Sequence, residues 1–135
     1  MRRQAIEKWT GLLLILAVGA IHLVTAPDQF NDATYKGLLF LANAAGVAVA
    51  AIGIWRSQQW GWLLGLAISA ATAAGYVLSR TVGLPGLPAD PNILEPLGIA
   101  AVGCELVFLA VAGLVILRKP AAPKFERQRQ EARAA

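Results

Sequence analysis

Four long apolar stretches constrain this chain more than any other feature of its sequence. They cover residues 9–26, 37–55, 60–80 and 95–117. A helix needs about 20 mostly apolar residues to cross the hydrocarbon core of a bilayer, and each stretch is close to that length. The sequence therefore predicts an all-α fold, a four-helix transmembrane bundle with short loops.

The amino-acid composition agrees with a membrane protein. Of the 135 residues, 57% are hydrophobic and 15% are charged, whereas a soluble domain carries about a quarter charged residues. A net charge of +4 would suit nucleic acid, but the basic residues stand at the ends of the apolar stretches, where they act as topology signals. We therefore expect membrane lipid, and no nucleic acid, as a partner.

The distribution of Lys and Arg predicts the orientation. One side of the bundle receives ten of these residues, and the other receives only Lys36 and Arg80. Because positively charged connections stay in the cytoplasm, we predict a multi-pass protein of the cell inner (plasma) membrane with both chain ends inside. The ten residues on the cytoplasmic side are Arg2, Arg3, Lys8, Arg56, Arg118, Lys119, Lys124, Arg127, Arg129 and Arg133.

Three connections and a tail complete the predicted topology. Residues 27–36 carry turn-forming Pro, Asp and Asn, residues 56–59 form a tight polar turn, and residues 79–95 contain several helix-breaking Gly and Pro. We assign residues 1–119 to the membrane domain and residues 120–135 to a polar, basic cytoplasmic tail.

The first apolar stretch allows a second interpretation. A basic start, an apolar run and the small residues Val24, Thr25 and Ala26 before Pro27 also fit a secretory signal peptide. Cleavage there would leave three helices, and the intact mass of the membrane-extracted protein distinguishes the two interpretations.

Small residues at helical spacing predict where the helices touch, because close backbone approach drives helix association in lipid. Gly46, Ala50 and Gly53 mark one face of the second helix, and Gly61 and Gly65 form a GxxxG pair on the third. We expect these faces to lie inside a compact bundle.

Few ionisable side chains fall within the apolar stretches, and each is informative because charge in the hydrocarbon region is costly. Glu105 lies about 15 Å below Glu95 at the rise of an α-helix, near mid-membrane. His22 is placed about one turn from the outer end of the first helix, and Asn43 roughly two turns below the outer end of the second.

A polar stripe on the third helix points to the same region. Ser69, Thr72, Tyr76 and Arg80 follow a spacing of three to four residues, which puts them on one helix face. We predict that these groups meet in a polar pocket open to the outside, with His22 at its mouth and Glu105 at its floor. The candidate ligand-binding residues are His22, Asn43, Tyr76, Arg80, Glu95 and Glu105.

A structural role remains an alternative for most of these side chains. His22 fits a satisfied structural histidine as well as a ligand-binding one, and Asn43 fits a hydrogen bond between helices. Arg80 is expected to pair with Glu95 or an aspartate of the outer loops. For Glu105 a functional role is favoured over a structural one, because a carboxylate at mid-membrane costs about 2.5–3.5 kcal/mol on insertion scales.

The sequence supports a metal site poorly, although Glu105, His22 and Asp28 or Asp32 could supply three oxygen and nitrogen ligands. One histidine excludes a bis-histidine haem, and the lone Cys104 excludes a Cys-based metal cluster and an intrachain disulfide. No phosphate-binding loop or nucleophile elbow is present. We predict no metal and no catalytic residue, and the sequence identifies no cofactor.

Several segments carry a resemblance to a known group of proteins. HLVTAPDQFNDATYKGLLFLANAAG, SRTVGLPGLP, the pair Glu95-Pro96 and the later Glu105 resemble small four-helix integral membrane proteins of actinobacteria and related bacteria, which share an SRT-x-GLP motif after helix three. The resemblance covers most of the chain. It implies the four-helix fold and supports His22, Arg80, Glu95 and Glu105 as pocket residues. It names no ligand, and the second histidine that many members carry after the first helix is absent here.

Three classes of function follow. The first is a small membrane protein whose outward-facing polar pocket binds a small ligand, a cation or a proton, acting as a homo-oligomer or with a partner. The second is an accessory subunit that packs against a larger membrane complex. The third and least favoured is a membrane enzyme in which Glu105 and His22 serve as acid and base.

Overall fold

The computed structural model describes residues 2–118, and its regular structure over these residues is helical. All four helices are long and apolar enough to cross a membrane, as the sequence predicts. The predicted tail, residues 120–135, lies outside the described residues. The helices are α1 (Arg2–Asp32), α2 (Thr34–Trp55), α3 (Gln59–Thr81) and α4 (Pro96–Leu117).

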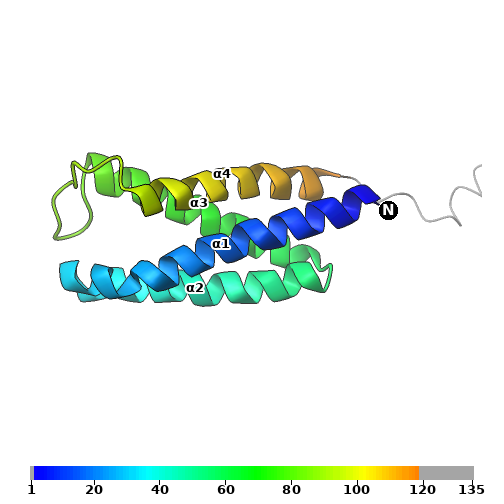
Figure 1. Cartoon of the computed structure of the whole chain (residues 1–135), viewed down its shortest axis with the longest axis horizontal. Coiled ribbons are helices and arrows are strands. Elements are labelled where there is room, and N and C mark those ends of the chain that lie inside the picture. Colours follow the sequence, from blue (N-terminus) through cyan, green and yellow to red (C-terminus); the bar gives the residue numbers. More distant parts are fainter. Residues whose placement is uncertain (1, 119–135) are drawn as a thin grey trace, which may run out of the picture.

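The four helices form one antiparallel bundle (Figure 1). α1 and α3 each pack on both α2 and α4. The start of α1, the α2–α3 turn and the end of α4 lie together at what we call the turn end, where Lys8 donates to the Ser57 hydroxyl and Arg118 pairs with Glu7. The opposite end, here the loop end, holds the α1–α2 junction and the loop of residues 82–95 (Figure 1).

The junction between α1 and α2 differs from the predicted connection over residues 27–36. That prediction is wrong, because α1 continues through Pro27 and only Ala33 separates it from α2. Proline removes a backbone N–H and usually ends or kinks a helix, but packing inside a bundle can maintain the helix beyond it. Here Phe30 lies directly against Gly37, in the space that a Cβ would need. This contact holds the last turns of α1 on α2.

Glycines bring α2 and α3 into backbone contact near the turn end. A Cβ on Gly61 would lie 2.5 Å from the backbone nitrogen of Ile54 and 2.7 Å from the Cα of Gly53. Because no side chain fits in this space, the crossing requires glycine on both helices. The predicted contact faces of these two helices are confirmed at this point.

The hydrophobic core occupies the part of the bundle nearer the turn end. Ile15 of α1, Trp62 of α3 and Phe108 of α4 are buried there. The rings of Trp62 and Phe108 stack with their centroids 5.9 Å apart, and the Trp62 ring also covers Gly11 of α1. Three helices are therefore joined through one aromatic pair.

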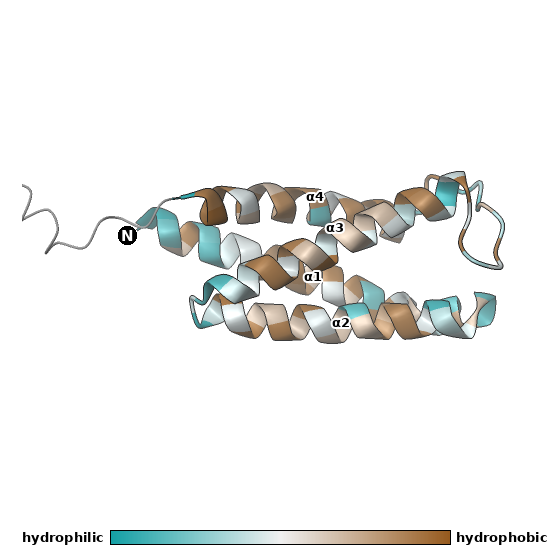
Figure 2. Cartoon of the chain, turned by 180° about the vertical axis from the view of Figure 1, so that it is seen from behind, coloured by the Kyte–Doolittle hydropathy of each residue, from teal (hydrophilic) through white to brown (hydrophobic). Residues whose placement is uncertain are grey.

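The outside of the bundle is apolar between two polar ends. Hydrophilic residues gather at the turn end and at the loop end, and the middle of the helices is largely hydrophobic (Figure 2). Large apolar side chains are exposed along this surface, such as Leu13 at 69%, Val24 at 71% and Leu114 at 58%. An apolar surface of this extent is typical of a membrane or protein contact.

Candidate functional site

A cavity of about 900 Å³ lies in the half of the bundle nearer the loop end, between the four helices and loop 82–95. Pockets that hold drug-sized ligands measure about 300–1,000 Å³, so this volume is sufficient for a small molecule. The structure brings all six sequence-predicted pocket residues to the wall of this one cavity: His22, Asn43, Tyr76, Arg80, Glu95 and Glu105.

The cavity exists because the packing along α3 changes with height. At Gly65 the bundle is closed, since a Cβ there would lie 2.6 Å from Ile15 Cδ1 and 2.7 Å from Phe108 Cζ. Further along the same helix, Gly75 lines the cavity and has nothing within 4 Å of its Cβ position. Bulky side chains from α1 and α4 fill the space beside the first glycine, and none fills the space beside the second.

Glu105 forms the floor of the cavity. Its side chain is 0% exposed, and neither carboxylate oxygen has a hydrogen-bond partner. The contact of Gly65 with Phe108 sets the α3–α4 register, and one helical turn nearer the loop end this register places Ser69 opposite Glu105. The Ser69 hydroxyl is also buried without a partner, but Ser69 does not line the cavity. Buried polar groups are nearly always hydrogen-bonded, so the Glu105 carboxylate at the cavity wall is an exception that a binding site explains.

His22 lies deeper than the sequence predicts. The expected place at the mouth, about one turn from the helix end, is wrong because α1 runs on to Asp32. The imidazole is 4% exposed and its ring centroid is 4.9 Å from that of Phe40 on α2. Its Nδ1 lies 2.9 Å from the Val18 carbonyl oxygen, and because a carbonyl only accepts, Nδ1 donates this bond. His22 therefore lines the cavity wall with one ring nitrogen already occupied.

Asn43 connects α2 to α3 across the cavity wall. Its Nδ2 donates to the Thr72 hydroxyl at 2.7 Å, and that hydroxyl donates in turn to the Ile68 carbonyl at 2.8 Å. The amide oxygen of Asn43 is buried and has no partner. Both roles that the sequence left open therefore fit Asn43. Its amide nitrogen bridges the two helices, and its amide oxygen remains available to accept a hydrogen bond from a ligand.

Arg80 fastens the loop to α3 at the mouth of the cavity. Its guanidinium pairs with Asp90 and lies 2.5 Å from Glu95 Oε2, which confirms the predicted pairing. It also lies 4.9 Å above the ring of Tyr76, whose hydroxyl donates to the Ile93 carbonyl at 3.0 Å. Arg80 and Tyr76 therefore fix the loop as a rim around the cavity.

A tight turn shapes the tip of this loop. Leu84 and Leu87 exchange backbone hydrogen bonds of 3.1 and 2.8 Å, with Pro85 and Gly86 between them. Gly86 has a φ of +77°, which the third position of a type II turn requires. The Tyr35 hydroxyl of α2 donates to the Pro85 carbonyl at 2.8 Å, so the turn is tied to the opposite side of the bundle.

The predicted list of pocket residues omits the acidic groups on the α1 side of the mouth. Asp28 and Asp32 line the cavity, and Lys36 pairs with Asp32 at 2.5 Å. They were left out because the sequence predicts a connection over residues 27–36. A signal was present, since Asp28 and Asp32 stand four residues apart and share one face of a helix that is continued through the proline.

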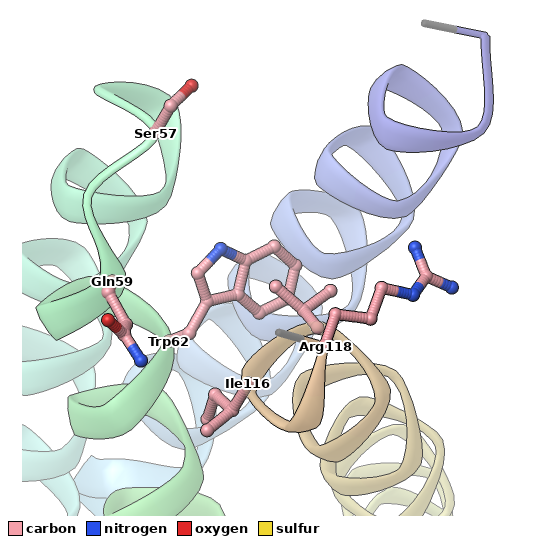
Figure 3. A pocket seen from close by; sticks show the side chains of 6 residues that line it. Ser57, Gln59, Trp62, Ile116 and Arg118 are labelled. Atoms are coloured by element: carbon pink, nitrogen blue, oxygen red, sulfur yellow. The ribbon is translucent and has the colours of Figure 1, made fainter. Parts of the chain in front are cut away.

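Two further observations limit what else the described residues offer. Between residues 2 and 118, no group of three His, Cys, Asp or Glu side chains could hold a metal ion. A second pocket, of about 260 Å³, lies at the turn end, and the side chain of Arg118 in its wall extends away from Trp62 (Figure 3). This guanidinium donates to Glu7 at 2.6 Å. This pocket is lined by Ser57, Gln59, Trp62, Val115, Ile116 and Arg118.

No protein-family model matches this sequence, and no curated protein or solved structure matches it either. The functional argument therefore rests on the geometry of the cavity.

Proposed function

We propose that this chain is an integral membrane protein that binds a small ligand in a polar cavity open to the outside of the cell. The apolar surface of its four helices supports the membrane setting. The ratio of ten Lys and Arg residues to two supports cytoplasmic ends for the chain. In that orientation the loop end, and the cavity with it, faces outward.

The unpartnered carboxylate of Glu105 carries this proposal. A carboxylate at the centre of a membrane costs about 2.5–3.5 kcal/mol, and an internal hydrogen bond or ion pair would offset part of that cost. Glu105 has neither, although it is fully buried. A ligand that enters the cavity and supplies the missing partner accounts for a glutamate at this position.

We further propose that the chain belongs with the small four-helix bacterial membrane proteins that it resembles. His22, Arg80, Glu95 and Glu105 all fall in the segments that carry the resemblance. The same four residues line the cavity, so the resemblance and the geometry support one site.

An accessory subunit of a larger membrane complex is the second candidate. It is favoured by the number of polar groups that already have partners inside the chain, among them His22, Asn43 and Arg80. The bond of Asn43 links two helices, and the apolar exterior would serve as the docking surface. Glu105 does not fit this pattern, which makes ligand binding the first candidate.

Native mass spectrometry after extraction in mild detergent tests the proposal. Gly75→Leu fills the cavity from a position with open space, and Gly113→Leu is the matched control, because Gly113 also has open space around its Cβ position but does not line the cavity. We expect a small-molecule adduct on the unmodified protein and on Gly113→Leu, and none on Gly75→Leu. The same adducts on all three proteins, or none on any of them, would contradict ligand binding. Constant association with other protein chains would favour the accessory subunit.

A further inference from the structure

We infer that the ligand is a lipophilic organic monocation, held with its positive charge near Glu105 and its apolar surface against the cavity wall. This inference rests on the proposed function and names the chemical class that the same site accepts.

The charges around the cavity leave a negative excess. Both basic residues of the lining are used within the chain, since Arg80 pairs with Asp90 and Glu95, and Lys36 pairs with Asp32. Among the acidic lining residues, Asp28 at the mouth and Glu105 at the floor have no ion pair in the described part of the chain. A cation therefore meets an unpaired carboxylate at the entrance and another at the end of the cavity, whereas an anion meets no unpaired Lys or Arg.

The chemistry of the floor selects an organic cation over a metal ion. Calcium takes about 6–8 oxygen ligands and magnesium needs octahedral geometry. Residues 2–118 contain no group of three acidic, His or Cys side chains that could hold such an ion. A single carboxylate, with the unpartnered amide oxygen of Asn43 in the same cavity wall, is sufficient for an ammonium or phosphonium group.

The walls above the floor select an apolar body. Between Glu105 and the rim the cavity is lined by Ile21, Leu39, Phe40, Ile68 and Leu97. Contact with these side chains removes apolar ligand surface from water, and the volume of about 900 Å³ is far larger than a hydrated inorganic ion needs. A small hydrophilic amine would leave most of this wall uncovered.

Three probes of similar aromatic character and different charge test the inference. They are tetraphenylphosphonium, its anionic near-isostere tetraphenylborate, and neutral triphenylphosphine oxide. Equilibrium binding of each is measured by titration calorimetry with the purified full chain in detergent. The proteins are the unmodified chain, Glu105→Gln, Gly75→Leu and Gly113→Leu. Glu105→Gln keeps the shape of the side chain and removes its charge.

We expect the phosphonium to bind the unmodified chain and Gly113→Leu equally. Removing one partner of a buried charge pair is costly, so Glu105→Gln should bind it on the order of 30-fold more weakly, and Gly75→Leu should lose it. Equal phosphonium affinity in Glu105→Gln and in the unmodified chain overturns the inference. The inference is also overturned if the phosphonium fails to bind the unmodified chain, or if it binds no better than the borate or the oxide. If the borate or the oxide binds and Gly75→Leu abolishes it, the cavity binds ligands of another class and the proposed function stands. If no probe binds and extraction yields no adduct, both proposals fail.

Discussion

Gly65 of α3 lies against the ring of Phe108 on α4, so close that a Cβ on the glycine would be 2.7 Å from Phe108 Cζ. One helical turn nearer the loop end, the packed core stops and the carboxylate of Glu105 begins the cavity floor. The bundle therefore combines two kinds of interior, one closed by glycines and aromatic rings and one left open around polar groups.

The α2–α3 crossing gives a direct test of the closed part. Gly61→Ala places a methyl group 2.5 Å from the backbone nitrogen of Ile54, and overpacking of this kind costs about 1–3 kcal/mol. Gly75→Ala on the same helix meets open space and should be neutral or stabilising by up to about 1 kcal/mol, since alanine favours a helix over glycine. Reversible unfolding in mixed micelles measures both, and a similar loss in the two variants would contradict the packing described here.

Two glutamates at the cavity should respond oppositely to replacement by leucine. Glu105→Leu removes a buried group that has no partner, and we expect the free energy of unfolding to stay the same or rise by about 1–3 kcal/mol. Glu95→Leu removes a partner of Arg80 and should lower the free energy of unfolding. The same unfolding assay checks this, and a marked loss of stability in Glu105→Leu would mean that the carboxylate has a structural partner.

The Asn43–Thr72 hydrogen bond of 2.7 Å is expected to contribute modestly to helix association. Interhelical hydrogen bonds in a membrane average about 0.6 kcal/mol in double-mutant cycles. Asn43→Ala, Thr72→Val and the double variant form the cycle. We expect a coupling free energy of about 0.5–1.5 kcal/mol, and strictly additive effects would show that the bond does not connect α2 to α3.

The loop at the mouth should loosen at low pH. The backbone N–H of Asn92 donates to Asp90, and together with the Arg80 guanidinium it lowers the pKa of the Asp90 carboxyl from its ordinary value of 3.8. A carboxyl whose pKa is lower in the folded state than in the unfolded state stabilises the fold at any pH above its ordinary pKa. This stabilisation disappears as the pH falls through the lowered pKa of the folded state. Loop 82–95 of the unmodified protein should therefore exchange its amide hydrogens more slowly than that of Asp90→Asn at about pH 6, and equally fast below about pH 3.

That comparison contains its own control. Amides in the middle of α3 should exchange alike in both proteins at both pH values, because the substitution is confined to the loop. A difference between the two proteins that persists in strong acid would assign the effect to packing and not to the carboxylate.

The four helices could be predicted from the sequence because the length and apolar character of a spanning segment are set by the bilayer itself. The position where α1 ends could not be predicted from the sequence. Pro27 and the turn-forming residues after it favour a break, whereas packing between α1 and α2, including the contact of Phe30 with Gly37, maintains the helix through them. The same error placed His22 at the mouth, whereas it lines the cavity wall, and left Asp28 and Asp32 out of the predicted pocket residues.

The candidate site could be predicted from the sequence only in part. Glu105 stands out because a carboxylate is rare in an apolar stretch, and helical spacing alone relates Tyr76 to Arg80. The openness of the cavity at Gly75 could not be read from the sequence, since Gly65 is also a glycine of the same apolar helix and is closed. Which glycine meets a neighbouring side chain depends on the register between helices.

The most direct test of the central claim compares two positions one turn apart on α4. Val102 lines the cavity, whereas Leu106 is 56% exposed on the outer surface of the bundle. In a Cys104→Ser background, Val102→Cys and Leu106→Cys are each treated with a membrane-impermeant thiol reagent added outside intact cells. We predict rapid modification at position 102 that Gly75→Leu blocks, and none at position 106. Equal modification of the two positions, or none at 102, would mean that no water-filled cavity leads from the cell exterior toward Glu105.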